Sequence, residues 1–385
     1  AEPEKGPGSA SIKSYIKLLH REISLSPKAK PLSTVYIGGG TPSLLSPSQI
    51  SNLLEHLRSH YGFQPGAEIT LEIDPASFDD VSLKGFLDAG INRLSLGGQS
   101  FDDHVLGQLG RRHTSSQLID SCDLINESFR RGKLSSWSLD LIQNLPGIEM
   151  NFWKDQILKA LSMTPPHLSI YDLSIEEGTV FAWRHNRGEL SLPKEELSSE
   201  ISKMTSQLLK EEGLSRYEIS NYALPGHASR HNRVYWNGSG WWGFGQGATS
   251  CPWGKRLARP RTRDSYKQWL EKQESRGIDQ SLKSFDSDQF IPIEEFLIVG
   301  FRRREGVDLK VLGEQLDWNI NKLQTNVNKL KNRWQEALKN GNIKQRGYRF
   351  YLTDPEGMNI SNFLLVELLL WLESLEVYSF DESNS

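Results

Sequence analysis

The sequence predicts an α/β fold: a partial (β/α)6 barrel of the TIM type whose first strand is missing, followed by an α+β, winged-helix-like domain. In the first half of the chain, β-rich runs alternate with helical patterns at intervals of roughly 25 to 35 residues, which is typical of parallel βαβ units. None of these units carries a Gly-x-Gly-x-x-Gly turn, so a barrel is favoured over a dinucleotide-binding sheet. The C-terminal part has the pattern of three helices and a short β-ribbon.

The predicted barrel elements follow one another along the chain. Apolar residues at three- and four-residue spacing predict an opening helix over 12–23. Strands are then expected at 34–37, 68–74, 91–96, 137–142, 167–173 and 217–222, with helices at 46–60, 81–89, 116–129, 151–162 and 194–212. A crossover helix packs beside a preceding parallel strand. Because the series begins on a helix, we expect that a first strand and its loop belong before Ala1.

The rest of the chain predicts a connection and a second domain. Gly, Arg and Pro crowd between Gly254 and Arg263, so the expected division is a barrel with its extension over 1–253, a connection over 254–285 and a C-terminal domain over 286–385. Helices are expected at 292–303, 307–316, 321–340 and 359–375, with a hairpin strand at 347–353. Winged-helix domains often bind nucleic acid, but many only pack or mediate contacts.

Composition narrows the classes of function. The 385 residues include 45 Lys and Arg, 48 Asp and Glu and two cysteines, with a net charge of −3. This balance gives no general attraction for polyanions, so nucleic acid is not an expected partner. No apolar run is long enough for a transmembrane segment, and the chain is expected to be soluble and intracellular. Cys122 and Cys251 are too few and too far apart for a disulfide framework or a cysteine-rich metal site.

Polar and glycine-rich segments follow the predicted strands, where α/β barrels gather their functional groups. They are Gly38 to Pro42, Glu72 to Pro75, Gly97 to Phe101, Asp140 to Gly147 and Tyr171 to Ser174. Such a rim suits a ligand with an amino group, a carboxylate and ribose hydroxyls, because glycine-turn carbonyls bind an amine, Arg111 binds a carboxylate and Glu or Asp binds a ribose. Alone, the glycines could be only a turn and Glu72 only a solvated strand end.

These segments resemble a known family. Tyr36-Ile-Gly-Gly-Gly-Thr-Pro-Ser-Leu-Leu45, Gly97-Gly-Gln-Ser-Phe101, Leu109-Gly-Arg-Arg-His113 and Asp140-Leu-Ile-Gln-Asn-Leu-Pro-Gly147 are similar to radical SAM proteins of the oxygen-independent coproporphyrinogen oxidase-like family. His231-Asn-Arg-Val-Tyr-Trp236 and Gly243-Phe-Gly-Gln-Gly-Ala248 resemble its haem-chaperone (HemW) branch more closely than the true oxidases. The resemblance covers nearly the whole chain, including 294–308.

The resemblance implies a binding site for S-adenosylmethionine (SAM). It places Gly39, Gly40 and Thr41 at the methionyl end of SAM. The residues that match positions binding the rest of the molecule are Glu72, Gln99, Arg111 and Asp140, with Ser174 at a position where the family varies.

The chain departs from the family at its iron ligands. The family is defined by Cys-x3-Cys-x2-Cys, whose thiolates hold a 4Fe-4S cluster. That motif is absent here, and neither Cys122, in a helical segment, nor Cys251, far downstream, is expected to replace it. We therefore assign no metal ligand and no catalytic residue, and expect that the chain as written does not cleave SAM reductively. A truncation or a divergent gene model is favoured over a natural variant.

The haem-chaperone resemblance points to His231. An imidazole can ligate iron, and the aromatic residues from Tyr235 to Trp242 could line a macrocycle or simply pack the mouth of the barrel. His227 and Cys251 are the alternative ligands. A structural hydrogen bond is expected for His113, and Thr249 stands where the family usually has a histidine.

Three functions remain open from the sequence. The main hypothesis is a HemW-like protein that binds haem and passes it to an acceptor protein. The alternatives are an oxygen-independent coproporphyrinogen III oxidase, in a cluster-bearing form, and a non-catalytic scaffold derived from the family. The expected location is the cytoplasm, or a mitochondrion or plastid in a eukaryote, and the sequence leaves the oligomeric state open.

Overall fold

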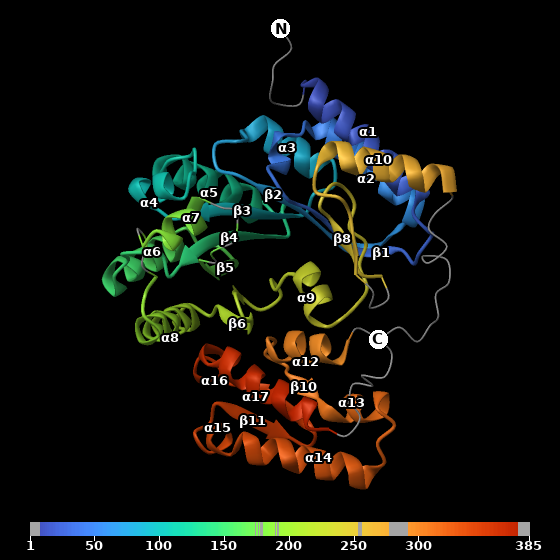
Figure 1. Ribbon diagram of the computed structural model, residues 1–385. Coiled ribbons are helices and arrows are strands. Elements are labelled where there is room, and N and C mark those ends of the chain that lie inside the picture. Colours follow the sequence, from blue (N-terminus) through green and yellow to red (C-terminus); the bar gives the residue numbers. More distant parts are fainter. Residues whose placement is uncertain are drawn as a thin grey trace.

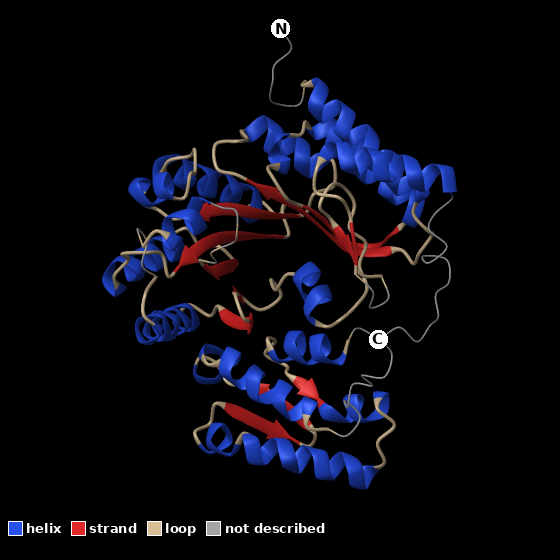
Figure 2. Ribbon diagram, in the orientation of Figure 1, coloured by secondary structure: helices blue, strands red, loops and turns tan. Residues whose placement is uncertain are grey.

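The computed structural model describes residues 8–173, 175, 177, 180–188, 190, 192–252, 256–276 and 292–375. Its main sheet has the strand order β1-β2-β3-β4-β5-β7-β6 and curls into a half-barrel (Figures 1 and 2). The strands are β1 (Leu32–Ile37), β2 (Phe63–Ile73), β3 (Arg93–Gln99), β4 (Ser136–Gln143), β5 (His167–Asp172), β6 (Ser215–Glu218) and β7 (Asn221–Ala223). β1 to β5 are parallel neighbours, which confirms the predicted α/β barrel class.

Helices cover the convex face of this sheet. They are α1 (Ala10–Leu25), α2 (Pro47–Tyr61), α3 (Asp80–Asp88), α4 (Asp103–Gln108), α5 (Ser115–Arg130), α6 (Met150–Ser162), α7 (Val180–Asn186) and α8 (Glu195–Glu211), with a short 3-10 helix, η1 (Pro42–Leu44), after β1. α2 begins where its sequence predicts. The Ser46 side chain accepts from the Gln49 N–H and the Gln49 side chain bonds back to Ser46, with Pro47 in the first turn.

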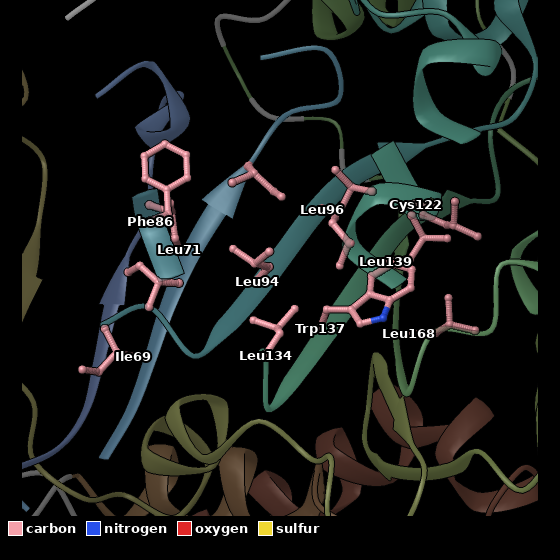
Figure 3. Close-up of a cluster of buried hydrophobic side chains, with 14 of the residues drawn as sticks. Ile69, Leu71, Phe86, Leu94, Leu96, Cys122, Leu134, Trp137, Leu139 and Leu168 are labelled. Carbon is pink, nitrogen blue, oxygen red and sulfur yellow. The ribbon is translucent and has the colours of Figure 1, made fainter. Parts of the chain in front are cut away.

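A buried apolar layer joins the helices to the sheet (Figure 3). Alternate residues of each strand, such as Ile69, Leu71 and Leu94, point into this layer, where Trp137 and Phe86 are at most 1 % exposed. Each large apolar side chain buried in this way stabilises the fold by about 1.5–3 kcal/mol. The alternation leaves the intervening, mostly polar residues for the concave face of the half-barrel.

The sixth predicted strand, 217–222, has a different form. The chain makes a hairpin there, and β7 pairs antiparallel with both β5 and β6. Arg216 Nε donates to the carbonyl of Ile219 at 3.0 Å, which closes the turn. The turn depends on the side chain of Arg216, and a short alternating run of residues carries no signal of such a contact. The sequence therefore predicts a single strand over 217–222.

The C-terminal part has the expected winged-helix-like composition of helices and a small sheet. Its helices are α12 (Ile293–Phe301), α13 (Leu309–Gln315), α14 (Ile320–Arg333), α15 (Gln335–Lys339), α16 (Glu356–Asn359) and α17 (Ser361–Glu373). β10 (Val307–Asp308), β12 (Arg349–Leu352) and β11 (Ile343–Arg346) form an antiparallel sheet in that order. Trp334 and Trp371 lie in the core of this part, each at most 1 % exposed.

The stretch between the two parts contains more structure than the expected connection. After α9 (Arg230–Trp236) and the paired β8 (Thr249–Ser250) and β9 (Leu257–Ala258), helix α10 (Arg263–Arg276) lies against α1 (Figure 1). Leu18, Tyr266 and Leu270 form a buried cluster at this contact. The ion pair of Arg259 with Glu22, at 2.8 Å, is buried nearby. The domain limits at 253 and 285 stay predictions.

Polar contacts connect the half-barrel to the C-terminal part. Arg216 Nη1 lies 3.3 Å from Asp354 Oδ1, and Ser202 Oγ donates to Asn359 Oδ1 at 2.6 Å. Arg233 of α9 pairs with Glu305. Among the described residues, no helix has both the length and the apolar character that crossing a bilayer needs.

Candidate functional site

A cavity of about 470 Å³ opens at the carboxyl ends of β1 to β5. This is the edge of a parallel sheet at which α/β proteins bind ligands. It is lined by Tyr36, Gly40, Thr41, Pro42, Glu72, Ile73, Asp74, Ser95, Gly97, Gln99, Arg111, Asp140, Ile142, Tyr171, Asp172 and Leu173.

Glu72 organises the glycine turn after β1. One of its carboxylate oxygens accepts from the Tyr36 hydroxyl at 2.7 Å, and the other accepts from the Gly39 N–H at 2.8 Å. A Cβ on Gly38 would lie 2.6 Å from the Tyr36 ring and 2.8 Å from Glu72 Oε1, so no other residue fits there without displacing them. Gly40 has φ +65°, a left-handed value that favours glycine. The turn is therefore built for a close approach to Glu72.

Two residues on the rim, Thr41 and Gln99, have constrained conformations. Thr41 Oγ1 donates to Asp74 Oδ2 at 3.1 Å, across the turn. Gln99 ends β3 with φ +64°, an uncommon conformation for a residue with a side chain, and is 8 % exposed. Strain of this kind persists where the surrounding structure holds it, and it clusters at ligand sites.

Asp140 is one of the acidic residues that line the cavity. Its oxygens accept from Ser95 Oγ and Ser138 Oγ, each at 2.8 Å. Burial raises the pKa of the carboxyl group, and hydrogen bonds from neighbouring serines act in the opposite direction. The serine hydroxyls leave Asp140 able to accept from a ligand hydroxyl in the cavity.

The structure brings most of the expected SAM-site residues together. Those that line the cavity are Gly40, Thr41, Glu72, Gln99, Arg111 and Asp140. Gly39 adjoins it through its bond to Glu72, whereas Ser174 lies outside the described residues. Sequence reasoning missed Tyr36 and Ser95, which also line the cavity. The signal that could have identified them is their place on the polar side of the strand alternation.

His231 lies at the start of α9, against β1. Its backbone N–H donates to Glu68 at 2.9 Å, its Nδ1 lies 2.9 Å from Thr34 Oγ1, and its Nε2 lies 2.9 Å from the Tyr235 hydroxyl. The ring stacks on Tyr36, with centroids 5.0 Å apart and planes 20° apart. Burial lowers the pKa of His231 to about 4, so the imidazole is neutral near pH 7.

The alternative haem ligands have other surroundings. His227 Nδ1 lies 3.0 Å from Ser136 Oγ, and the ring meets Phe129 edge to face. Cys251 is 1 % exposed and its backbone pairs with Trp241. His113 Nε2 lies 3.2 Å from the Gly98 carbonyl, the structural hydrogen bond that the sequence predicts for it.

The residues present do not provide an iron–sulfur ligand set. Within the described ranges, no group of three or more His, Cys, Asp or Glu side chains could hold a metal ion. The 385 residues contain two cysteines, fewer than the three thiolates that such a cluster takes from a radical SAM protein. Cys122 is fully buried in α5, where burial raises the pKa of its thiol to about 12.

The half-barrel and its strand-end cavity define the class of protein. Residues 16–151 match the family model of the Radical SAM superfamily. In fold, the chain is similar to the coproporphyrinogen III oxidase HemN from Escherichia coli, a radical SAM enzyme, with a TM-score of 0.69 over 92 % of this chain and 82 % of that one, at 20 % identity.

Curated relatives narrow the class to a family. The chain is 37 % identical to the haem chaperone HemW of Synechocystis sp. over 93 % of this chain and 88 % of that protein, and 32 % identical to HemW of Lactococcus lactis over 93 % and 90 %. It is 31 % identical to the mitochondrial radical S-adenosyl methionine domain-containing protein 1 of Danio rerio over 92 % and 78 %. The chain belongs to the HemW family of radical SAM proteins.

Proposed function

We propose that this protein is a haem-binding chaperone that holds haem at His231 and passes it to an acceptor protein. Membership of the HemW family supports the proposal. The observation that carries it is the environment of His231, whose imidazole is neutral and in contact with the cavity-lining ring of Tyr36. A neutral imidazole nitrogen is the form that ligates iron.

Two aromatic side chains and one hydrogen bond surround the His231 ring, where haem would bind. Tyr36 stacks on one side of the His231 ring, and Tyr235 meets it edge to face. Nε2 already pairs with the Tyr235 hydroxyl, so iron ligation by this nitrogen requires that Tyr235 move away. The Tyr235 hydroxyl would then compete with the iron, which suits a protein that must release its cargo.

The strand-end cavity is proposed to hold SAM. Its volume lies within the usual range of small-molecule sites, and its donors and acceptors match the ligand. The turn residues Gly39, Gly40 and Thr41 would bind the methionyl amine and Arg111 its carboxylate. The acceptors for the ribose and the remaining polar groups would be Glu72, Gln99 and Asp140, with Ser174 a further prediction. When bound beside a reduced 4Fe-4S cluster, SAM supplies a radical; the role assigned to the residues that line this cavity is the binding of SAM.

A haem titration tests the proposal directly. The native protein should give a shifted Soret band that saturates with haem. We expect His231→Ala to weaken haem binding about tenfold or more. His227→Ala is the matched control, because this second histidine bonds to Ser136 and should leave the Soret band unchanged. Identical spectra for native protein and His231→Ala at every haem concentration would contradict the proposal.

Transfer requires its own measurement. Protein loaded with haem is mixed with apomyoglobin as a receiving probe, and the Soret band of holomyoglobin is followed over time. We expect Tyr235→Phe to slow this transfer, because the hydroxyl that competes for Nε2 is removed. If native protein and Tyr235→Phe release haem at the same rate, Tyr235 does not take part in release.

A further inference from the structure

Arg93 is the most unusual charged residue of the half-barrel. It begins β3 and is 3 % exposed, on the concave face of the sheet. Its guanidinium atoms Nε and Nη2 are buried and have no hydrogen-bond partner in the described part of the chain. A buried charge without a partner destabilises a fold by several kcal/mol, so its retention calls for a reason.

Other buried arginines of this protein are paired. Arg259, 7 % exposed, lies 2.8 Å from Glu22, and Arg216, 8 % exposed, lies 3.3 Å from Asp354. No carboxylate of the described residues lies within ion-pair distance of Arg93. Arg93 therefore differs from them in its missing counter-charge and not in its burial.

The two orphaned atoms form one edge of the guanidinium. Nε–H and Nη2–H point in the same direction, and this fork matches the two oxygens of a carboxylate. The protein uses the same edge on its surface, where Arg21 Nε and Nη2 donate to the two oxygens of Glu274. The free edge of Arg93 is thus shaped for a carboxylate.

Thr70 adds a second unpartnered group, on the neighbouring strand. Thr70 and Arg93 are register partners on β2 and β3, so their side chains point to the same face of the sheet. Thr70 is fully buried and its Oγ1 has no hydrogen-bond partner within the described ranges. A hydroxyl next to the fork can donate a third hydrogen bond to a carboxylate.

The pair lies between the two proposed ligand sites. Ser95, two residues after Arg93 on the same face of β3, lines the strand-end cavity. Thr70 is also the register partner of Tyr36, whose ring stacks on His231. The charge of Arg93 adds to the burial that lowers the pKa of His231. The Arg93 charge also opposes the burial that raises the pKa of Asp140. Arg93 is close enough to act on both sites.

We propose that Arg93 and Thr70 form a carboxylate-binding site inside the half-barrel, which a ligand of the protein completes. This inference rests on the proposed function for the source of the carboxylate, which is a propionate of haem, because the methionyl carboxylate of SAM is assigned to Arg111 in the strand-end cavity. A propionate offers the planar, singly charged group that this fork matches. Binding it neutralises Arg93 and satisfies the Nε, Nη2 and Oγ1 donors together.

Matched pairs of ligands test the site. Haem is compared with haem dimethyl ester, and SAM with decarboxylated SAM, by Soret titration and by calorimetry. The variants are Arg93→Met, which removes the charge at similar length, and Arg93→Lys, which keeps the charge without the fork. We expect Arg93→Met to weaken haem binding about tenfold or more and to leave the binding of haem dimethyl ester, SAM and decarboxylated SAM unchanged. Arg93→Lys should fall between, and Thr70→Val should weaken the same ligand by a smaller factor.

The pair that responds identifies the source. If only haem responds, the partner is a propionate; if only SAM responds, the propionate site is overturned, together with the assignment of the methionyl carboxylate to Arg111. Equal effects on both members of each pair, or no effect on any ligand, would overturn the site. Should the native protein bind SAM but no haem, the chaperone proposal fails and the propionate site fails with it, whereas haem binding that Arg93→Met leaves unchanged overturns the site alone. Binding of neither would overturn both. If Arg93→Met does not fold, as judged by circular dichroism, the Arg93→Lys comparison decides.

Discussion

At the scale of single residues, Tyr36 connects the two halves of the site. Its ring stacks on His231, and its hydroxyl donates to Glu72, which in turn accepts from the Gly39 N–H. One side chain thus touches both the proposed haem ligand and the turn proposed to hold SAM. A change at Tyr36 can be designed to affect only one of them.

Tyr36→Phe keeps the ring and removes the hydroxyl. Loss of one hydrogen bond to a carboxylate leaves Glu72 with a single protein donor, a change of about 1.5–3 kcal/mol in the contacts that order the turn. We expect SAM affinity, measured by calorimetry, to fall about tenfold while the haem titration stays as in the native protein. A matching loss of haem affinity would show that the hydroxyl, and not only the ring, supports His231.

The pKa of His231 predicts a pH dependence. It lies at about 4 in the folded chain, against a usual value of about 6.5. Because the unfolded chain takes up this proton first, the contribution of His231 to stability is fully present above about pH 6.5 and declines as the pH falls towards 4. Haem affinity should likewise stay level from pH 8 to about 5 and fall below that. A midpoint near 6.5, lost in His231→Ala, would contradict a buried imidazole.

At the scale of elements, local signals predict most of the fold. Ser46, Pro47 and Gln49 specify the start of α2 without help from distant residues, and period-two alternation specifies β2. The β6–β7 hairpin depends instead on Arg216 reaching the carbonyl of Ile219, and α10 depends on packing against α1. Such tertiary contacts leave no pattern in the sequence itself.

The candidate site is predictable to a similar degree. Glu72, Gln99 and Asp140 lie towards the carboxyl ends of neighbouring parallel strands, and the topology alone brings those ends together. Arg93 and Thr70 could not be identified in this way, because an arginine or threonine in a strand usually has a hydrogen-bond partner. Only the folded structure shows that the buried polar atoms of Arg93 and Thr70 have no hydrogen-bond partner among the described residues.

The turn after β1 gives a prediction at this scale. Gly38→Ala would place a methyl group 2.6 Å from Tyr36 and 2.8 Å from Glu72. We expect a loss of about 1–3 kcal/mol in the free energy of unfolding, measured in urea, together with weaker SAM binding. Gly107→Ala, in α4, is the control: nothing lies within 4 Å of its new Cβ, so stability should hold or rise. Equal effects of both substitutions would show that the crowding at Gly38 is relieved easily.

At the scale of the whole molecule, polar contacts join two separate apolar cores. The clusters of the half-barrel and of the C-terminal part are each large, whereas Arg216, Asp354 and Asn359 meet between them. Arg216 is nearly buried, so its pairing carries more weight than a surface ion pair.

Asp354→Ala should loosen this connection. Removing the carboxylate leaves Arg216 buried without its counter-charge, and we expect a loss of about 1–3 kcal/mol and a broader thermal transition. Glu314→Ala breaks the exposed pair with Lys310 and should change stability by less than about 0.5 kcal/mol. A single sharp transition with an unchanged midpoint in Asp354→Ala would show that the two cores are coupled by other contacts.

The aromatic residues around His231 should also make haem binding visible in the intrinsic tryptophan fluorescence of the protein. Tyr235, which bonds to His231, meets the indole of Trp241 edge to face with centroids 4.8 Å apart. Haem absorbs where tryptophan emits, so a haem on His231 should quench the fluorescence of Trp241, and Trp241→Phe should lose that share of the quenching. The loading and release of haem could then be followed in real time from the fluorescence of Trp241, without an added label.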